Sequence, residues 1–399
     1  MRFRLAPTPA QEQALLEHCS QARYVWNLAV EQHQHWRPGR AGAPGYGEQS
    51  RQLTEARKAF DWLAAGSQTV QQQALRDFAQ AMAGFFAGTH GRPTWRKAGV
   101  HEGFRIVGSR GRHWDVRRLS RKVGEVWIPK VGWVRFRWSR QIPEETKSFR
   151  VNRDHAGRWH VAFAVIPPPI NGPGTGEVVG VDRGVVVSAA LSTGERLSVP
   201  GLRETEGERL LRLQRQLARA KPGSNRRKGV KTAIARIKAR QTDRRKDWAE
   251  KTSTRLAADF DVVRVEDLKI KNMVRSARGT SAAPGTNVRA KAGLNRSIHE
   301  AGGGLLVTRL EDKARGRVEK VNPAYTSQIC HACGHCAAEN RESQAVFRCR
   351  ACGHTDHADV NAAKNIRDIA VGRTVTARGA LQPPGGAMNR EPQPVLTSG

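Results

Sequence analysis

Cys330-His-Ala-Cys-Gly-His and Cys349-Arg-Ala-Cys-Gly-His are two near-identical knuckles, and they lead directly into Ala358-Asp-Val-Asn-Ala-Ala. Two cysteine pairs with this spacing place four thiolates around one tetrahedral ion, for which zinc is the natural occupant. The glycine after each pair permits the positive φ that points backbone N–H groups at the sulfurs. The pattern therefore predicts a closed, structural zinc site with four ligands: Cys330, Cys333, Cys349 and Cys352.

Other interpretations of these cysteines are weaker. Cys336 stands three residues after Cys333 and could replace it or Cys330, but only the 330/333 pair matches the second knuckle residue for residue. Cys336 is therefore interpreted as a bystander. An iron–sulfur site would need a further cysteine and a proline nearby, and these are missing. The doubling of the pattern disfavours a pair of reduced cysteine turns without a metal.

The composition indicates what kind of partner the chain binds. Its 399 residues include 68 Lys and Arg against 36 Asp and Glu, which gives a formal net charge of +32. An excess of this size predicts a polyanionic partner, and nucleic acid is the default. No apolar run approaches the length of a membrane span, and no apolar stretch after Met1 could act as a signal peptide. We therefore expect a cytoplasmic, intracellular protein without a membrane partner.

The first 90 residues predict one strand followed by a small helical bundle. Residues 1–8 alternate like a strand, and Thr8-Pro-Ala-Gln offers a capping box with proline at the first helical position. Two apolar stripes at helical spacing predict core faces: Leu15, Cys19, Ala22, Trp26 and Ala29, then Leu75, Phe78, Met82 and Phe85. Glutamine can pair with adenine edges, so three residues are candidates for base contacts, with a solvated helix face as the alternative: Gln71, Gln72 and Gln73.

Residues 91–170 predict antiparallel β structure, because short alternating runs are punctuated by glycine. Alternation within residues 133–138 turns three side chains toward a core: Val134, Phe136 and Trp138. The opposite face is basic and is a candidate nucleic-acid surface: Arg135 and Arg137. Three tryptophans among basic residues suit stacking on bases, with core packing as an equal alternative: Trp95, Trp114 and Trp127.

A linker rich in proline and glycine, residues 167–176, precedes a region of mixed strands and helices. A capping box at Thr205 predicts the start of a long helical stretch, which Pro222-Gly-Ser-Asn breaks into a hairpin. Residues 209–251 hold 16 basic and 3 acidic side chains. Because like charges repel, this excess favours a surface that tracks phosphates over a solvated face. The candidate contacts are Arg212, Arg219, Arg226, Arg227 and Lys228.

Three acids stand at the ends of predicted elements: Asp182 and Glu266 each follow an apolar strand, and Asp359 opens a helix. Each alone is more often a turn or cap residue. Together they offer hard oxygen ligands on rigid ends, as two magnesium ions need for phosphodiester cleavage. Three strands, a helical stretch and a fourth strand, with acids on the first and fourth, have the order of an RNase H-like nuclease. Asp267 and Asp356 are neighbouring decoys.

These motifs resemble the TnpB family, also called OrfB, which comprises transposon-associated relatives of type V CRISPR effectors. The resemblance rests on the two knuckles, the helix that follows them and four further stretches: Gly-Val-Asp182-Arg-Gly, Val-Glu266-Asp-Leu, Gly293-Leu-Asn-Arg-Ser-Ile and Asn322-Pro-Ala-Tyr-Thr-Ser-Gln. It extends to Arg23-Tyr-Val-Trp-Asn near the N-terminus and covers nearly the whole chain.

The resemblance implies a multidomain α+β fold. A split antiparallel β-barrel, the OB-like wedge domain, would carry an inserted helical recognition domain. An RNase H-like (RuvC) α/β nuclease domain would carry an inserted zinc ribbon that binds target nucleic acid. The expected domains are the wedge at 1–8 and 91–170, the helical domain at 9–90, the nuclease domain at 176–321 and 357–371, the ribbon at 322–356, and a disordered tail at 372–399.

The resemblance further implies an RNA-guided DNA endonuclease that cleaves double-stranded DNA beside a short motif. Asp182, Glu266 and Asp359 match the family's RuvC acids, which would hold two catalytic magnesium ions, and the four knuckle cysteines match its zinc ligands. The expected partners are a guide RNA from the transposon end and double-stranded DNA, with the protein monomeric on its RNA and at the prokaryotic nucleoid during targeting. Alternatives are a guided binder without cleavage, an unguided zinc-ribbon accessory of transposition, and a miniature type V CRISPR effector.

One stretch departs from many relatives. Ala301-Gly-Gly-Gly falls where the family has a helix, and three glycines within a helix would cost about 1 kcal/mol each relative to alanine. The sequence therefore predicts low local stability there. Residues 274–293, which are rich in Gly, Ala, Ser and Arg, are predicted to be a mobile loop.

Overall fold

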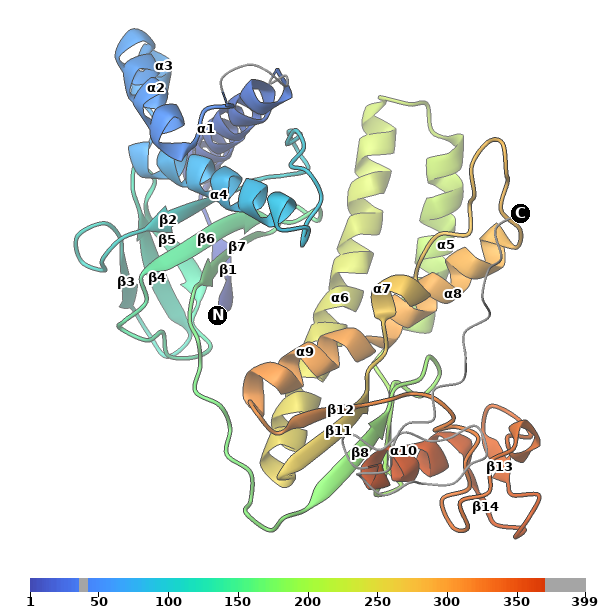
Figure 1. Cartoon of the computed structure of the whole chain (residues 1–399). Coiled ribbons are helices and arrows are strands. Elements are labelled where there is room, and N and C mark those ends of the chain that lie inside the picture. The colour runs from blue at the N-terminus through green and yellow to red at the C-terminus, as the bar shows by residue number, and fades with distance from the viewer. Residues whose placement is uncertain (36–41, 370–399) are drawn as a thin grey trace. The chain divides into compact units, whose positions relative to one another are not determined.

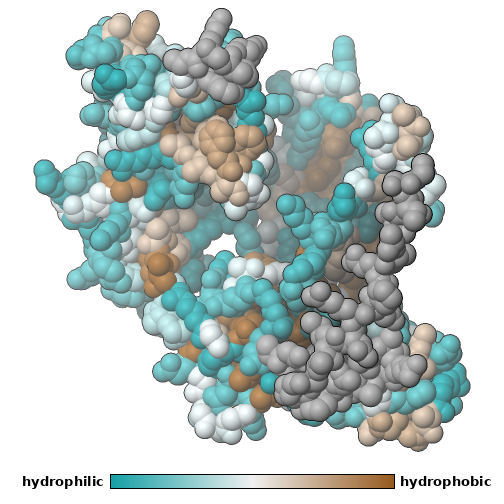
Figure 2. Space-filling model, viewed as in Figure 1, coloured by the Kyte–Doolittle hydropathy of each residue, from teal (hydrophilic) through white to brown (hydrophobic). Residues whose placement is uncertain are grey.

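The computed structural model describes residues 1–35 and 42–369 (Figure 1). The chain divides into two compact units: residues 1–166 with 208–239, and residues 167–207 with the chain from Arg240 onward. Each unit has its own hydrophobic core. Most of the surface visible in Figure 2 is hydrophilic, in keeping with the high net charge. None of the described helices is long and apolar enough to cross a membrane.

The predicted disordered tail, 372–399, lies outside the described residues, as do the last two residues of the predicted nuclease domain, 370 and 371.

The first unit contains a seven-stranded antiparallel sheet with the order β2-β6-β7-β1-β5-β4-β3. Strand β1 precedes the helices in sequence, yet it pairs with β7 on one side and β5 on the other, so the sheet is split as predicted. Strands β2 and β3 stand at the two ends of this order. Closure of the sheet into a barrel therefore stays a prediction. The strands are β1 (Arg2–Ala6), β2 (Gly103–Val107), β3 (Asp115–Arg118), β4 (Val123–Ile128), β5 (Gly132–Arg137), β6 (Ser148–Arg153) and β7 (Trp159–Phe163).

Helices α1 and α4 lie against this sheet (Figure 1). The predicted capping box opens α1: Thr8 Oγ1 accepts a hydrogen bond from Gln11 N at 3.3 Å, and Gln11 Oε1 accepts one from Thr8 N at 3.0 Å. Both predicted apolar stripes are buried, except that Phe85 is only partly buried. The helices of this bundle are α1 (Pro9–Gln34), α2 (Tyr46–Ala59), α3 (Asp61–Ala64) and α4 (Gln68–Phe86).

The core face predicted within residues 133–138 is confirmed, and for Trp114 the structure supports the second of its two predicted roles, core packing. Trp114 is 1% exposed, and its Nε1 donates a hydrogen bond to Gly108 O at 2.9 Å. It is a packing residue of the sheet, so stacking on a base is wrong for this position. Trp95 is exposed and Trp127 is partly buried.

The second unit is built on a five-stranded sheet with the order β10-β9-β8-β11-β12. Strands β8, β11 and β12 run parallel, while β9 and β10 extend the sheet antiparallel. Buried valines on one face pack against helices α6 and α9. The strands are β8 (Val178–Asp182), β9 (Ala189–Leu191), β10 (Arg196–Leu197), β11 (Val262–Glu266) and β12 (Val318–Val321). The two helices that cover this face are α6 (Asn225–Asp259) and α9 (Gly303–Lys313).

The predicted helical hairpin is formed by α5 (Glu204–Arg219) and α6 around the turn at Pro222. Helix α5 begins one residue before Thr205, so the predicted cap lies inside the first turn. Glu206 accepts a hydrogen bond from Arg203 N at 3.2 Å instead. The helix is therefore as predicted, but its capping residue is not.

Gly302 separates two helices, and this explains the glycine-rich stretch. It adopts a left-handed φ of 71° and ends α8 (Val288–Ala301) where α9 begins. Glycine occupies this region of φ without steric cost. The expected penalty for three glycines within one helix is therefore wrong, because Gly302 lies at a break. The region predicted as a loop, 274–293, is irregular only up to Asn287 and then enters α8.

Candidate functional site

Two of the predicted acids lie side by side at the carboxyl ends of parallel strands. Val181 of β8 is in register with Val265 of β11, so Asp182 and Glu266 are the next residues along neighbouring strands. Val181 and Val265 point into the core, and side chains alternate along a strand. Asp182 and Glu266 therefore share the opposite face of the sheet.

The third acid reaches this face on helix α10 (Ala358–Asp368), which lies directly on β8. A Cβ built on Gly180 would come within 2.0 Å of Ala363 O and 2.5 Å of Arg367 N, both backbone atoms of α10. Only glycine allows this approach. Asp359 stands in the first turn of the helix, so the packing of α10 on Gly180 sets its position beside Asp182.

Glu266 and Asp359 act electrostatically on Asp182. The pKa of Asp182 is raised to about 7, first by burial and then by the negative charges of Glu266 and Asp359. Burial also raises the pKa of Glu266, although the hydroxyl of Thr326 and the charge of Arg183 oppose the rise. A cluster of acids with raised pKa values is characteristic of functional sites.

Two further residues hold these carboxylates and were not predicted from the sequence. Thr326 Oγ1 donates a hydrogen bond to Glu266 Oε1 at 2.6 Å. Arg341 Nη2 donates to Asp359 Oδ1 at 2.9 Å, and the side chain of Asp359 is only 9% exposed. Thr326 belongs to Asn322-Pro-Ala-Tyr-Thr-Ser-Gln, which marked the position without indicating its contact; Arg341 carried no signal.

The four predicted cysteines come together in the ribbon. Within the described part of the chain, their sulfurs form the one group of three or more cysteine, histidine or acidic ligand atoms lying within 4.8 Å of one another. The three carboxylates do not form such a group. Sulfur atoms are 3.8 Å apart in the Cys330/Cys352 pair and 3.5 Å apart in the Cys333/Cys349 pair. A tetrahedral zinc with bonds of about 2.3 Å requires sulfurs about 3.8 Å apart, so these residues fit the ion.

The turns of the knuckles are as expected, because backbone N–H groups point at the sulfurs of Cys330, Cys333 and Cys349. Gly334 and Gly353 have the predicted positive φ, 77° and 72°. Their N–H groups donate to Cys330 O and Cys349 O, at 2.8 and 3.1 Å, rather than to sulfur. The glycines therefore close the turns, while a sulfur contact comes from Cys352 N to Cys349 Sγ at 3.5 Å. Cys336 is absent from the cluster of sulfurs.

Helix α10 is bound to the ribbon by two buried asparagines at helical spacing. Asn361 Nδ2 donates to Ile329 O at 2.8 Å, and its Oδ1 accepts from His331 N at 3.0 Å. Asn365 Nδ2 donates to Thr326 O at 2.9 Å and to Ile329 O at 2.7 Å. The same helix therefore carries Asp359 and holds the chain that leads into the first knuckle. The ribbon elements are η1 (Ala338–Asn340), β13 (Val346–Arg348) and β14 (Thr355–His357).

The three candidate glutamines differ in exposure. Gln71 is fully buried, and its amide binds Leu63 O at 2.8 Å and the guanidinium of Arg57 at 2.5 Å. Gln73 is 6% exposed. Base contact is therefore wrong for these two residues in this conformation, because their side chains are used inside the bundle. Gln72 is partly buried, and its Oε1 accepts hydrogen bonds from the hydroxyls of Tyr46 and Ser50.

The candidate arginines and lysine also differ. Arg135 is exposed but pairs with Glu125 at 3.3 Å, and Arg137 is exposed. Arg227 donates to Leu217 O at 2.7 Å and Ala220 O at 2.9 Å, so it terminates α5. The other candidates on the α5–α6 hairpin are exposed: Arg212, Arg219, Arg226 and Lys228.

The decoy acids are paired with lysines, Asp267 with Lys269 and Asp356 with Lys364.

Three family profiles match the chain. Residues 160–277 match a family described as "Probable transposase", residues 304–366 match "Cas12f1-like, TNB domain", and residues 1–40 match "Helix-turn-helix domain". In the described part of that last segment, the structure has strand β1 and the single helix α1.

Two relatives are similar over almost their whole length. The chain is 34% identical to "Putative RNA-guided DNA endonuclease InsQ" of Escherichia coli K12, over 99% of this chain and 97% of that protein. It is 30% identical to "Putative RNA-guided DNA endonuclease" of Streptomyces pristinaespiralis, over 95% and 90%. The solved "Cryo-EM structure of the Cas12f1-sgRNA-target DNA complex" has a similar fold, with a TM-score of 0.55 and 16% identity over 90% of this chain and 82% of that chain. The chain therefore belongs to the TnpB (OrfB) family, which is related to the type V CRISPR effectors.

Proposed function

We propose that this protein is an RNA-guided DNA endonuclease encoded by an insertion sequence, and that it cleaves double-stranded DNA beside a short flanking motif. The observation that carries the proposal is the placement of Asp182, Glu266 and Asp359 on one face of the second sheet, where burial and mutual repulsion raise the pKa of Asp182 to about 7. Buried acids that repel one another destabilise the folded protein. Their presence at one place is explained by a function that needs clustered carboxylates. The reaction itself is taken from the names of the two full-length relatives.

The three acids would hold two magnesium ions in a RuvC-type, RNase H-like site. Carboxylate oxygens on rigid strand and helix ends are the donors that magnesium prefers. When bound, such a pair of ions activates a water molecule and stabilises the leaving oxygen of a phosphodiester. Thr326 binds one oxygen of Glu266 and so orients the other. Arg341 neutralises Asp359 in the absence of a cation.

The ribbon supports the site from the side of α10. Four thiolates fill the coordination of a zinc ion, so this zinc would have no open position for chemistry. Asn361 and Asn365 bind the start of the ribbon to the helix that carries Asp359. The zinc would therefore be structural, and we propose that the ribbon brings the DNA strand to the acids.

The partners would be a guide RNA from the transposon end and a double-stranded DNA target. The net charge of +32 and the exposed basic residues of the α5–α6 hairpin support binding to phosphates. Base pairing with the guide would supply sequence specificity, while the protein reads duplex shape and a short motif. Of the three glutamines, only Gln72 is partly exposed, and it would contact that motif.

Co-purification and cleavage test this proposal. The protein is purified from cells that also carry its downstream flanking DNA, bound RNA is sequenced, and plasmids with targets matching that RNA are incubated with magnesium. A discrete RNA and guide-dependent cleavage are expected. A preparation without a discrete RNA would exclude the guided reaction, and RNA-dependent binding without cleavage would favour a guided binder.

A pair of acid variants tests the site. Asp182→Ala should abolish cleavage while RNA binding persists. The matched control is Asp267→Ala, which removes a carboxylate next to Glu266 that pairs with Lys269. This control should cleave normally, and equal activity of the two variants would refute the assignment of the acids.

A further inference from the structure

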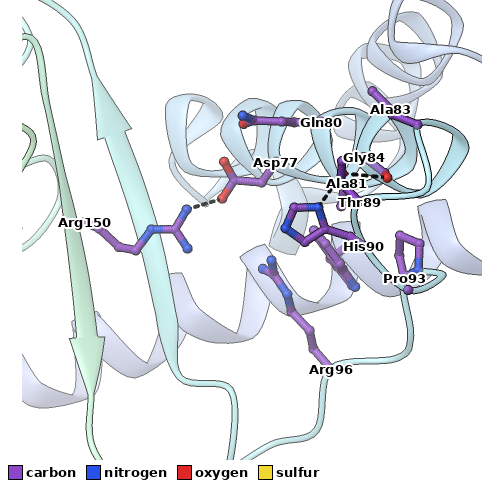
Figure 3. A pocket seen from close by; sticks show the side chains of 13 residues that line it. Asp77, Gln80, Ala81, Ala83, Gly84, Thr89, His90, Pro93, Arg96 and Arg150 are labelled. Carbon is purple, nitrogen blue, oxygen red and sulfur yellow. Dashed lines mark hydrogen bonds and ion pairs between the residues drawn. The ribbon is translucent and has the colours of Figure 1, made fainter. Parts of the chain in front are cut away.

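A basic pocket of about 770 Å³ lies in the first unit, beside the C-terminal half of α4 (Figure 3). It is formed by α4, the segment that follows α4, and residues of α1 and β6. The polar and charged residues in its lining include Asp77, Gln80, His90, Arg96 and Arg150. Neither the proposed cleavage nor the nucleic-acid contacts predicted from the sequence use these side chains.

Arg96 is held in a fixed position at this pocket. The side-chain amide of Asn27 binds the backbone of Arg96 twice. Its Nδ2 donates to Arg96 O at 3.1 Å, and its Oδ1 accepts from Arg96 N at 2.7 Å. Trp26 Nε1 donates to Thr94 O at 2.9 Å, and the guanidinium of Arg96 lies 3.6 Å from the centroid of the Trp26 ring. A guanidinium stacked in this way loses little freedom when it binds an anion.

The charge of Arg96 is balanced only from a distance, by the carboxylate of Asp77. Among the residues that the structure describes, no acid lies within ion-pair distance of its guanidinium. Asp77 lines the same pocket but pairs with Arg150 at 2.7 Å and with Arg105 at 3.5 Å. Burial lowers the pKa of Arg96 to about 10; the negative charge of Asp77 opposes this fall, and the positive charge of Arg150 contributes to it. A partly buried cation in this setting opposes folding, and an anionic ligand would compensate for that cost.

One wall of the pocket is formed by α4. Small residues of α4 line it, and the imidazole of His90 packs beside them (Figure 3). A Cβ on Gly84 would lie 2.9 Å from His90 Nδ1, so the glycine permits this close approach. Thr89 Oγ1, which is 2.9 Å from the same nitrogen, fixes the ring. Gln80 adds an amide that can pair with a base edge.

We propose that this pocket binds one unpaired nucleotide of a nucleic-acid strand, with its phosphate on Arg96 and its base against His90 and the wall of α4. A duplex keeps its bases stacked inside, so a concave site with a cation and a surface for stacking suits a nucleotide that has left the stack. RNA and DNA share this chemistry. The inference rests on the proposed nucleic-acid function but does not involve the acids or the zinc ribbon.

Photo-crosslinking tests the pocket locally, which matters because the whole chain is basic. The full-length protein, freed of nucleic acid at high salt, is irradiated with short single strands of RNA or DNA containing 4-thiouridine or 4-thiothymidine, and with the corresponding DNA duplex. Peptide mapping should locate a crosslink within residues 80–96 for single strands. Arg96→Gln should lower its yield about fivefold or more, while crosslinks elsewhere in the chain serve as the internal reference.

Three variants make the test specific. His90→Ala removes the stacking ring, leaves Arg96 in place, and should lower the yield as well. Arg96→Lys keeps the charge without the planar stack and should recover part of the yield. Arg92→Gln is the matched control, because Arg92 is exposed, lies outside the pocket lining and donates to His33 O. It should leave the yield unchanged.

The outcomes distinguish this inference from the proposed function. A preference for RNA or for DNA identifies which strand supplies the nucleotide. The pocket assignment fails if Arg96→Gln and His90→Ala crosslink like the parent, if other peptides react but residues 80–96 do not, or if the duplex reacts more strongly than the single strands. If no peptide reacts with any probe, the proposed nucleic-acid function itself fails.

Discussion

Asp182 carries its carboxyl at the buried end of β8, where burial, Glu266 and Asp359 raise its pKa from 3.8 to about 7. Because the higher pKa belongs to the folded state, the folded protein loses stability relative to the unfolded chain as the pH rises from about 4 to about 7. We expect Asp182→Asn to raise the free energy of unfolding of magnesium-free protein by about 1–4 kcal/mol at pH 8. The gain should shrink toward pH 4, because the carboxyl of the folded protein is then protonated and that of the unfolded chain is close to its own pKa of 3.8.

Denaturant unfolding at several pH values, in magnesium-free buffer that retains zinc, measures this gain. Asp267→Asn is the matched control, because the hydrogen bond and charge of Lys269 lower the pKa of Asp267. Neutralising that carboxylate should bring no stabilisation. The electrostatic interpretation is wrong if Asp182→Asn is no more stable than the parent at pH 8.

Arg341 compensates the charge of Asp359, which is nearly buried. Replacing it with glutamine leaves a desolvated carboxylate without its cation, and we expect a loss of about 1–3 kcal/mol without magnesium. Magnesium should restore part of this stability, because it can neutralise the same acid. Thermal unfolding with and without magnesium measures both effects.

The control for Arg341 is another arginine of the ribbon. Arg348 is more exposed and pairs with Glu342 at 3.7 Å, so Arg348→Gln should cost less than about 0.5 kcal/mol. If magnesium does not reduce the loss in Arg341→Gln, the arginine supports the packing of the ribbon instead of neutralising Asp359.

At the scale of elements, the contact of α10 with β8 positions the acids. Gly180→Ala would put a Cβ within 2.0 Å of Ala363 O, and backbone cannot yield as a flexible side chain can. We expect α10 to shift, the free energy of unfolding to fall by about 1–3 kcal/mol, and cleavage to fall about tenfold or more. Gly293→Ala is the control, because its Cβ meets no atom within 4 Å and alanine favours a helix. Normal cleavage by Gly180→Ala would show that α10 tolerates the displacement.

Sequence patterns predicted those parts of the site that a short stretch of residues specifies by itself. An apolar run followed by an acid located Asp182 and Glu266, and repeated spacing located the cysteines. The three adjacent glutamines show where such patterns fail: they look equivalent in sequence, but the partners of Gln71 lie on helices α2 and α3. Arg341 and Thr326 are ordinary polar residues until the ribbon brings them to the acids. Contacts of this kind depend on tertiary folding.

The zinc ribbon and α10 should behave as one cooperative element. Cys349→Ser removes a sulfur ligand, and the loss should spread through the hydrogen bonds from Asn361 and Asn365 to the start of the ribbon. We expect lower zinc content and faster amide exchange in residues 326–331 and in α10, with β4 and β5 of the first unit unchanged. Zinc analysis and hydrogen-exchange mass spectrometry measure this. Cys336→Ser should retain zinc and protection; equal loss in both variants would make Cys336 a ligand.

At the scale of the whole molecule, the charge of +32 has to be distributed over surfaces that meet phosphates. The α5–α6 hairpin supplies four exposed cations without a structural role in its turn: Arg212, Arg219, Arg226 and Lys228. Each phosphate contact adds to the slope of log affinity against log salt concentration. Replacing all four with glutamine should reduce that slope by as much as about 3–4 and weaken binding of RNA and DNA alike.

Arg227 provides the comparison that separates charge from structure on this hairpin. Its guanidinium terminates α5 by binding Leu217 O and Ala220 O, so Arg227→Gln should lower stability by about 1 kcal/mol but change the salt slope little. Binding measured by fluorescence anisotropy from low to high salt, beside thermal unfolding, distinguishes the two effects. If the quadruple variant keeps the parental slope, the hairpin does not track phosphates, and the excess positive charge must act through other surfaces of the two units.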